Sequence, residues 1–253
     1  MSFFLRAVAS LRQFVDLEKA TLDAVMRVAA PLAHGRLLDV GCGDKPYETL
    51  FAPYVAEYVG AEYHDTYATS ANVHKGKADV LYSGDRLPFE DGSFDTVLCN
   101  QVGEHVPHPE VLFAELVRVL ANGGKLIVTV PFSYRIHSEP NDFHRFTKYA
   151  LRAYAGQHGL TVNLLLARGG FWQVIGQKLS SHMALRFARL GGWVQVLGGF
   201  GYEQAVKEPP RFWVLPAVAP AMLGVAAAAR LLDRIDYDES DTMGYLLVAG
   251  KNA

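Results

Sequence analysis

The chain has 253 residues, half of them apolar, which is enough for one large buried core and favours one α/β domain with an elaboration. Its 24 basic and 26 acidic residues nearly cancel, which excludes strong electrostatic steering toward nucleic acid, so we expect no nucleic-acid partner. The two cysteines, Cys42 and Cys99, lack CxxC spacing, which excludes a disulfide framework and a thiolate metal site and fits a cytoplasmic location.

The first 35 residues are predicted to form an amphipathic helical cap. Arg6, Arg12 and Asp16 interrupt the apolar run, which argues against a signal peptide. Apolar residues recur here at helical spacing: Leu11, Phe14, Val15, Leu22, Val25 and Met26. We therefore expect residues 1–35 to pack as a lid or cap on the main domain.

Short apolar runs then alternate with segments of helical pattern. The runs predicted as buried strands are residues 36–40, 58–62, 94–100 and 125–130, with a weaker strand at 80–82. The helices predicted between them are residues 47–55 and 110–120. This alternation predicts a parallel sheet with right-handed crossovers.

The alternation stops in the second half of the chain. Asn122-Gly123-Gly124 is expected to end a helix, and Thr147 to cap the start of another that runs toward Gly159. Strands are predicted at residues 160–167 and 245–249. We therefore divide the chain into the cap, a core of residues 36–168, an insertion of residues 169–238 and a last core strand within 239–253.

The segment LLDVGCGDKPYE, from Leu37 to Glu48, predicts a strand, a two-glycine turn and the start of a helix. In an open parallel sheet, ligands bind beyond the carboxyl ends of the strands, where glycines allow close backbone approach. Pro46 occupies the third glycine position of the dinucleotide fingerprint, and Asp39 would repel a diphosphate. Both residues argue against an NAD(P)-dependent oxidoreductase.

A ligand with an amino-acid end fits this turn better than a diphosphate. Asp39 can attract an ammonium group, while helix N–H groups attract a carboxylate. Glu62 ends the second strand about 20 residues later, where a carboxylate can accept hydrogen bonds from both hydroxyls of a ribose. S-adenosylmethionine satisfies both ends of this site.

Five ordered motifs then resemble those of class I S-adenosylmethionine-dependent methyltransferases of the type 11 group. They are DVGCG, VGAE, LPFEDGSFDTV, EHV and RVLANGGKLIVTVP, and the similarity as a whole covers about residues 37–160. The resemblance implies a Rossmann-like α/β fold with a seven-stranded sheet of order 3-2-1-4-5-7-6, helices on both faces and a final antiparallel hairpin.

The resemblance also implies a set of cofactor-binding residues. Asp39, Gly41 and Gly43 would hold the methionine end, and Glu62 the ribose. Tyr63 and the loop Ser83, Gly84, Asp85 to Leu87 would surround the adenine, with Asn100 and Gln101 near the sulfonium. The family often has an acid four residues before LPF, where this chain has Ser83, so Asp85 is a candidate replacement.

Methyl transfer to a hydroxyl needs a base beside a well-aligned acceptor. The candidates are Glu104-His105 and the polar loop of residues 131–147. We assign the base to His137 first and His105 second, with Asp142 and Arg145 in orientation or acceptor binding. A competing interpretation makes Asp142 and Arg145 a loop-anchoring ion pair.

A metal interpretation is weaker. Gln101-x-x-Glu104-His105 is similar to the ExxEH metal motif of methyltransferases that act on small-RNA 3′ ends, and Asp142 lies near the place of their further histidine. Gln101 replaces the first glutamate and removes a charged ligand for a hard cation. We therefore predict no metal site.

The insertion combines an uncharged run, FWVLPAVAPAMLGVAAAA, with tryptophans and flanking arginines. Three interpretations stay open: a cap over the acceptor pocket, a peripheral membrane contact through residues 169–235, and a dimer interface. A bilayer span is disfavoured by Pro216 and Pro220.

The leading function is an S-adenosylmethionine-dependent methyltransferase that methylates oxygen on a small, lipid-linked or glycan-linked acceptor. The alternative is a non-catalytic cofactor-binding module whose insertion recruits a partner or membrane.

Overall fold

The computed structural model describes residues 14–64, 77–187 and 211–252. They form two compact units. The larger unit comprises residues 24–132, 143–166 and 244–253, and the smaller unit residues 1–23, 133–142 and 167–243.

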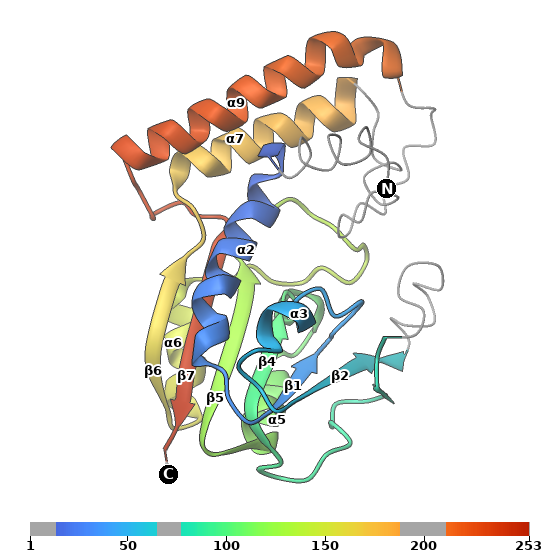
Figure 1. The fold of residues 1–253 in the computed structure, drawn as a ribbon, viewed down its shortest axis with the longest axis vertical. Coiled ribbons are helices and arrows are strands. Elements are labelled where there is room, and N and C mark those ends of the chain that lie inside the picture. The colour runs from blue at the N-terminus through green and yellow to red at the C-terminus, as the bar shows by residue number, and fades with distance from the viewer. Residues whose placement is uncertain (1–13, 65–76, 188–210, 253) are drawn as a thin grey trace. The chain divides into compact units, whose positions relative to one another are not determined.

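A seven-stranded sheet of order β3-β2-β1-β4-β5-β7-β6 forms the larger unit and confirms the predicted topology (Figure 1). Its strands are β1 (Arg36–Val40), β2 (Glu57–Tyr63), β3 (Val80–Tyr82), β4 (Phe94–Asn100), β5 (Leu120–Pro131), β6 (Leu160–Ala167) and β7 (Gly244–Lys251). The strands from β3 to β5 pair in parallel, whereas β7 pairs antiparallel with β5.

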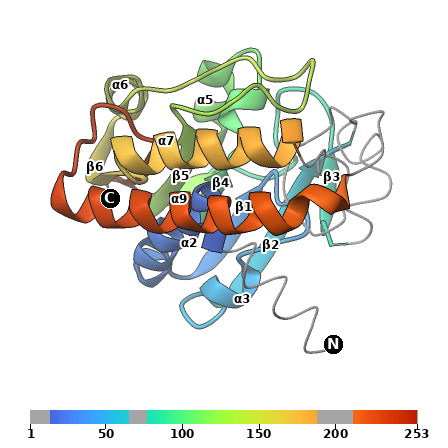
Figure 2. The same cartoon turned by 90° about the horizontal axis from the view of Figure 1, so that it is seen from above.

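Helices cover both faces of this sheet. They are α3 (Glu48–Phe51), α5 (Pro109–Val119), α6 (Lys148–Gln157) and the second half of α2 (Leu17–Ala29), with short 3-10 turns η1 (Ala30–Leu32) and η2 (Gly103–His105). Figure 2 shows α5 and α6 on one face and α2 and α3 on the other. Because both faces are covered, the central strands are continuous apolar runs, and Leu37, Leu38 and Val40 are fully buried.

Two elements differ clearly from their predicted bounds. The strand predicted at 125–130 begins at Leu120, so Asn122-Gly123-Gly124 lies inside β5 and does not cap α5, which ends at Val119. The helix predicted over 47–55 is the four-residue α3. Ala52 still has helical backbone angles (φ −48°, ψ −36°), but the proline at position 53 has no N–H with which to continue the helical hydrogen bonds. Thr147 caps α6 as predicted, by accepting a hydrogen bond from Ala150 N (3.1 Å).

The smaller unit is built on the antiparallel pair of α7 (Phe171–His182) and α9 (Leu215–Ile235). These helices lie side by side in Figures 1 and 2. A π-helical turn, η3 (Met183–Phe187), extends α7, and the 3-10 turn η4 (Phe212–Val214) precedes α9. Leu17, Val174, Ala226, Ala229 and Met243 form the apolar core of this unit.

Polar contacts fix the register of α7 against α9. Gly170 N and Gln173 Nε2 both donate to Asp233 Oδ2, at 2.9 and 2.7 Å. A Cβ on Gly176 would lie 2.6 Å from that of Ala229, so glycine allows the two helices to approach closely.

Helix α9 continues through Pro220 as an unbroken helix of 21 residues. Both Pro216 and Pro220 are exposed, so water can satisfy the carbonyl that loses its partner. The two prolines therefore do not interrupt the helix. Among the described residues, α9 alone is long and apolar enough to cross a bilayer by length and composition.

Candidate cofactor and acceptor site

The glycine turn after β1 is held against the end of β2 by backbone hydrogen bonds. Gly41 N and Cys42 N donate to Ala61 O, at 2.8 and 3.2 Å. Gly41 and Gly43 have φ angles of 71° and 50°, in the left-handed region that favours glycine. The turn thus has a defined conformation before any ligand binds.

Glu62, at the end of β2, closes the contact between the turn and the strand. Its Oε2 accepts from Gly43 N (2.8 Å) and its Oε1 from Tyr63 N (3.0 Å), and the side chain is buried. Each carboxylate oxygen has a second lone pair, so Glu62 can still accept two ribose hydroxyls. This capacity fits the ribose role that the resemblance implies.

Asp39 lies on β1 and is buried, with a hydrogen bond from Tyr58 Oη to its Oδ2 (2.7 Å). Burial raises the pKa of Asp39 to about 7, and the nearby carboxylate of Glu62 adds to the rise, whereas the Tyr58 hydrogen bond opposes it. A ligand ammonium would restore the charged form of Asp39, because an opposite charge favours ionisation. The donor set of Asp39 and Glu62 therefore fits the methionine and ribose ends of S-adenosylmethionine.

Cofactor affinity should rise with pH through the titration of Asp39. Below pH 7 the carboxyl must lose a proton to bind an ammonium group, so affinity for S-adenosylhomocysteine should rise roughly 20-fold between pH 5.5 and 7.5. The stability of the ligand-free protein should change with pH in the opposite direction. The pKa of Asp39 is higher in the folded than in the unfolded chain, so the free energy of unfolding should fall by about 3 kcal/mol from pH 4 to pH 7.

Titration calorimetry across this pH range checks the prediction. Tyr58→Phe removes a hydrogen bond that lowers the pKa of Asp39, so the midpoint of the profile should move to higher pH. Asp39→Asn should flatten the profile. An unchanged profile in Asp39→Asn would exclude Asp39 as the titrating group.

Lys45, which was not predicted from the sequence, links the glycine turn to Asp79. The side chain is buried and its Nζ pairs with Asp79 Oδ2, which also accepts from Gly60 N (2.7 Å). A Cβ on Gly60 would lie 2.4 Å from Lys45 Cε, so the lysine lies directly over the glycine of β2. A lysine in a turn normally indicates a solvated residue, so the sequence carried no signal for this contact.

The predicted adenine residues follow β2 and β3. Tyr63 meets the Tyr82 ring edge-to-face, with 5.7 Å between centroids. Ser83, Gly84 and Asp85 are exposed, so the Asp85 carboxylate is open to solvent beside the loop. Leu87 is buried and its N donates to Glu115 Oε2 (2.9 Å), which also gives it a structural role.

Asn100 and Gln101, at the end of β4, share one buried partner. Thr129 Oγ1 donates to Asn100 Oδ1 (2.6 Å) and accepts from Gln101 Nε2 (3.2 Å). Gln101 has a φ of 56°, which turns the chain sharply away from the strand. Its amide is thus engaged with Thr129, and in an ExxEH metal motif a glutamate would stand here.

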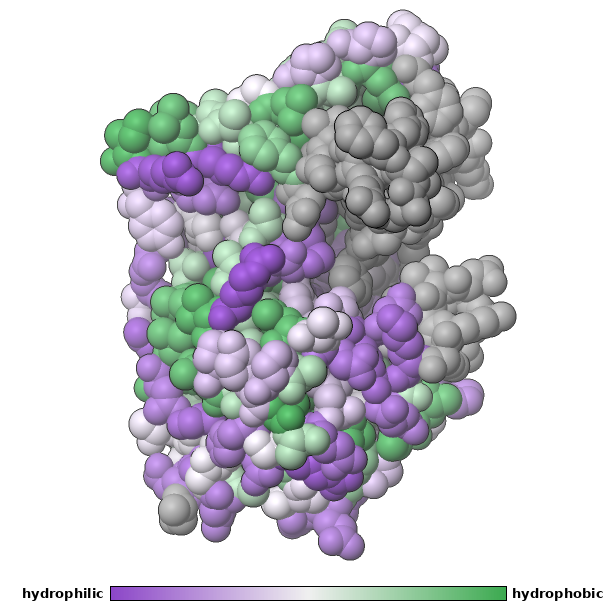
Figure 3. Space-filling model, viewed as in Figure 1, coloured by the Kyte–Doolittle hydropathy of each residue, from purple (hydrophilic) through white to green (hydrophobic). Residues whose placement is uncertain are grey.

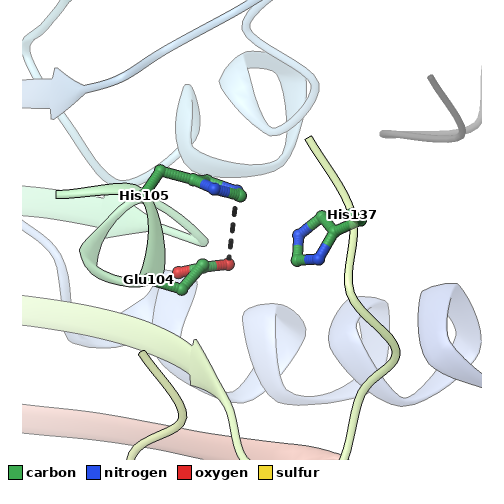
Figure 4. Close-up of side chains that lie close together, drawn as sticks. All are labelled: Glu104, His105 and His137. Atoms are coloured by element: carbon green, nitrogen blue, oxygen red, sulfur yellow. Dashed lines mark ion pairs between the residues drawn. The ribbon is translucent and has the colours of Figure 1, made fainter. Parts of the chain in front are cut away.

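The next turn, η2, carries Glu104 and His105. Glu104 is fully buried, and its carbonyl accepts from Phe143 N (2.8 Å) and His144 N (3.2 Å). Figure 4 shows the ion-pair contact of His105 Nε2 with Glu104 Oε1, at 3.9 Å. Because a Cβ on Gly41 would lie 2.4 Å from Val102 Cγ2, the glycine turn and this segment are packed together.

The loop of residues 133–142 places His137 against Asp142. Asp142 Oδ2 accepts from His137 N (2.9 Å) and lies 3.3 Å from His137 Nδ1, which also faces Arg135 O (3.2 Å). The Tyr134 ring packs edge-to-face on the imidazole. A carboxylate at Nδ1 fixes the ring and directs base chemistry to Nε2 on its opposite side.

Arg145, the last predicted residue of the acceptor side, donates from Nη1 to His144 O (2.7 Å). His144 Nε2 in turn lies 3.2 Å from Pro107 O. The two residues thus form part of the packing between the end of the polar loop and the segment before α5.

Part of the chain is similar in sequence to known methyltransferases. Residues 38–128 match the family Methyltransf_11, described as a methyltransferase domain. An uncharacterized methyltransferase of Mycobacterium leprae is 35% identical over 140 residues, which cover 51% of each chain. A chloroplastic tocopherol O-methyltransferase of Arabidopsis thaliana is 36% identical over 102 residues, 37% of this chain and 29% of the relative.

The fold extends further than the sequence match. An S-adenosylmethionine-dependent methyltransferase from Mesorhizobium loti superposes with a TM-score of 0.52 at 13% identity, covering 92% of this chain and 99% of that one. In sequence, the chain spans about half or less of the length of these curated relatives. Residues 38–128 therefore match a methyltransferase domain, and the fold is that of the S-adenosylmethionine-dependent methyltransferase from Mesorhizobium loti. The donor set of Asp39 and Glu62 fits S-adenosylmethionine as the cofactor of such a domain.

Proposed function

We propose that the protein methylates an oxygen atom of a small or lipid-linked acceptor. The observation that carries this proposal is the contact of His137 with the buried carboxylate of Asp142. A hydroxyl acceptor must lose its proton as it attacks, and an imidazole oriented by a carboxylate is suited to take that proton. The tocopherol O-methyltransferase, similar over 102 residues, supports oxygen as the methylated atom.

When bound, S-adenosylmethionine would supply the methyl group to the acceptor oxygen, and its sulfur would leave as a neutral thioether. His137 Nε2 would take the proton that the acceptor hydroxyl loses. Asp142 holds the imidazole through Nδ1 and stabilises its protonated form. Asp39 and Glu62 orient the cofactor, and this alignment contributes to the rate by making the reaction effectively unimolecular.

Histidine variants test the assignment of the base. His137→Ala should lower product formation by 100-fold or more, because general base catalysis contributes about that much, and should leave cofactor affinity unchanged. His105→Ala tests the second candidate in the same way. His108→Ala, an exposed histidine before α5, is the matched control and should retain full activity.

The assay is release of S-adenosylhomocysteine by the whole protein incubated with lipid and aqueous extracts, followed by mass spectrometry. Methylated product in one extract identifies the acceptor class. Equal activity in the His137→Ala and wild-type proteins would exclude His137 as the base. Tight cofactor binding with no turnover in any extract would favour the non-catalytic binding module.

A further inference from the structure

The smaller unit presents two chemically different ends. In the antiparallel pair, Gly170 contacts Asp233 and Gly176 faces Ala229, so later residues of α7 meet earlier residues of α9. Continuing this register places η3, and Phe187 at its end, beside the first turns of α9. We call residues 183–187 and 211–215 the basic end of the pair, and residues 233–241 its acidic end.

Charge distinguishes these two ends among the described residues. Residues 169–187 and 211–232 contain four charged side chains, all basic: Lys178, Arg186, Arg211 and Arg230. Residues 233–241 contain five acids against one base, Arg234. A negatively charged surface would attract the basic end and repel the acidic end.

Large apolar side chains are exposed at the basic end. Trp213 is 77% exposed and Phe187 is 54% exposed. Tryptophan is enriched where lipid headgroups meet hydrocarbon, because its ring is apolar and its N–H is polar. Arginine beside it can pair with anionic headgroups.

The outer face of α9 extends this apolar surface away from the basic end. Its exposed residues between the first turn and Ala228 are Pro216, Ala217, Pro220, Ala221, Gly224, Ala227 and Ala228. None carries a charge, and 11% of the most apolar stretch of the helix is buried. The core helix of a soluble protein would be mostly buried. Figure 3 shows green and pale side chains, with some purple ones, over the pair of α7 and α9.

We propose that the basic end docks on the surface of an anionic lipid bilayer, with Trp213 and Phe187 in the headgroup region. Arg186 and Arg211 contact the headgroup phosphates, and the adjoining face of α9 lies against the interface. The acidic end stays in water. None of these residues takes part in the proposed methyl transfer, so an experiment can reject one proposal without rejecting the other.

Vesicle flotation tests the charge and apolar parts separately. The whole protein should float with vesicles of phosphatidylcholine mixed with phosphatidylglycerol, and less with phosphatidylcholine alone. Arg186→Glu with Arg211→Glu should weaken binding roughly tenfold or more, as should Trp213→Ser with Phe187→Ser. The matched control is Ile235→Ser with Tyr237→Ser, which removes equally exposed residues at the other end and should float as the parent does.

Fluorescence tests the orientation. A variant that retains only Trp213 should be quenched by brominated lipid, whereas one that retains only Trp172, bonded to Asp236 at the acidic end, should not. Absence of flotation, or equal quenching of both, overturns the proposal. So does resistance to extraction at high pH, which would mean that α9 spans the bilayer. A dimer in sedimentation that Trp213→Ser dissolves, without lipid binding, would assign the surface to a second copy.

Discussion

Glu62→Ala should weaken S-adenosylmethionine binding by about 100-fold or more in titration calorimetry. Each hydrogen bond from a ribose hydroxyl to a carboxylate is worth about 1.5–3 kcal/mol, and alanine removes two of them. The substitution also frees Gly43 N, which now donates to Glu62 at 2.8 Å, so the glycine turn loses part of its support. Both effects act in the same direction.

Two further variants separate these effects. Glu62→Gln keeps an acceptor for Gly43 N but loses the charge, so it should bind the cofactor with intermediate affinity. Glu57→Ala removes an exposed glutamate at the opposite end of β2, where its partner is Arg36, and should leave binding unchanged. Parent-like affinity in Glu62→Ala would remove the ribose role of this residue.

Gly41→Ala should abolish measurable cofactor binding at micromolar protein concentration and lower thermal stability. The φ of 71° strains any L side chain by about 1–3 kcal/mol. The new Cβ would also lie 2.4 Å from Val102 Cγ2, so either the turn or the segment after β4 must shift. A shift of the turn displaces the backbone that has to meet the methionine end.

Gly159→Ala separates the backbone strain of a positive φ from the steric clash with Val102. Gly159 has a φ of 68°, and no atom lies within 4 Å of the Cβ it would carry. It should lose a similar few degrees of melting temperature but bind the cofactor normally. If both variants bind the cofactor equally well, close approach at Gly41 is not required.

The sheet could be predicted from the sequence because its central strands are buried on both faces and so are unbroken apolar runs. The ends of elements were harder to predict. Leu120 turns directly from helix to extended backbone, with a ψ of 127°, so β5 begins before the glycines that suggested a cap. Helix α9 continues through Pro220 because this side of the helix is exposed, so water can bond the backbone carbonyl that loses its N–H partner.

The cofactor site was predictable only in part, for a similar reason. Gly41, Gly43 and Glu62 are visible because glycine and a strand-end acid are chemically distinctive at those places. Tyr58 and Lys45 were missed, since an aromatic residue in a strand normally indicates packing and a lysine in a turn normally indicates solvent. Their partners, Asp39 and Asp79, lie 19 and 34 residues away in the sequence, so the contacts depend on the register of the folded sheet.

The most direct test of the cofactor site is a crystal structure of the protein with S-adenosylhomocysteine. We expect both ribose hydroxyls to donate to Glu62, and the amino-acid end to lie at the Gly41–Gly43 turn with its ammonium nearest Asp39. Density for the nucleoside at any other place, or a Glu62 carboxylate without ribose contact in the occupied site, would contradict the account.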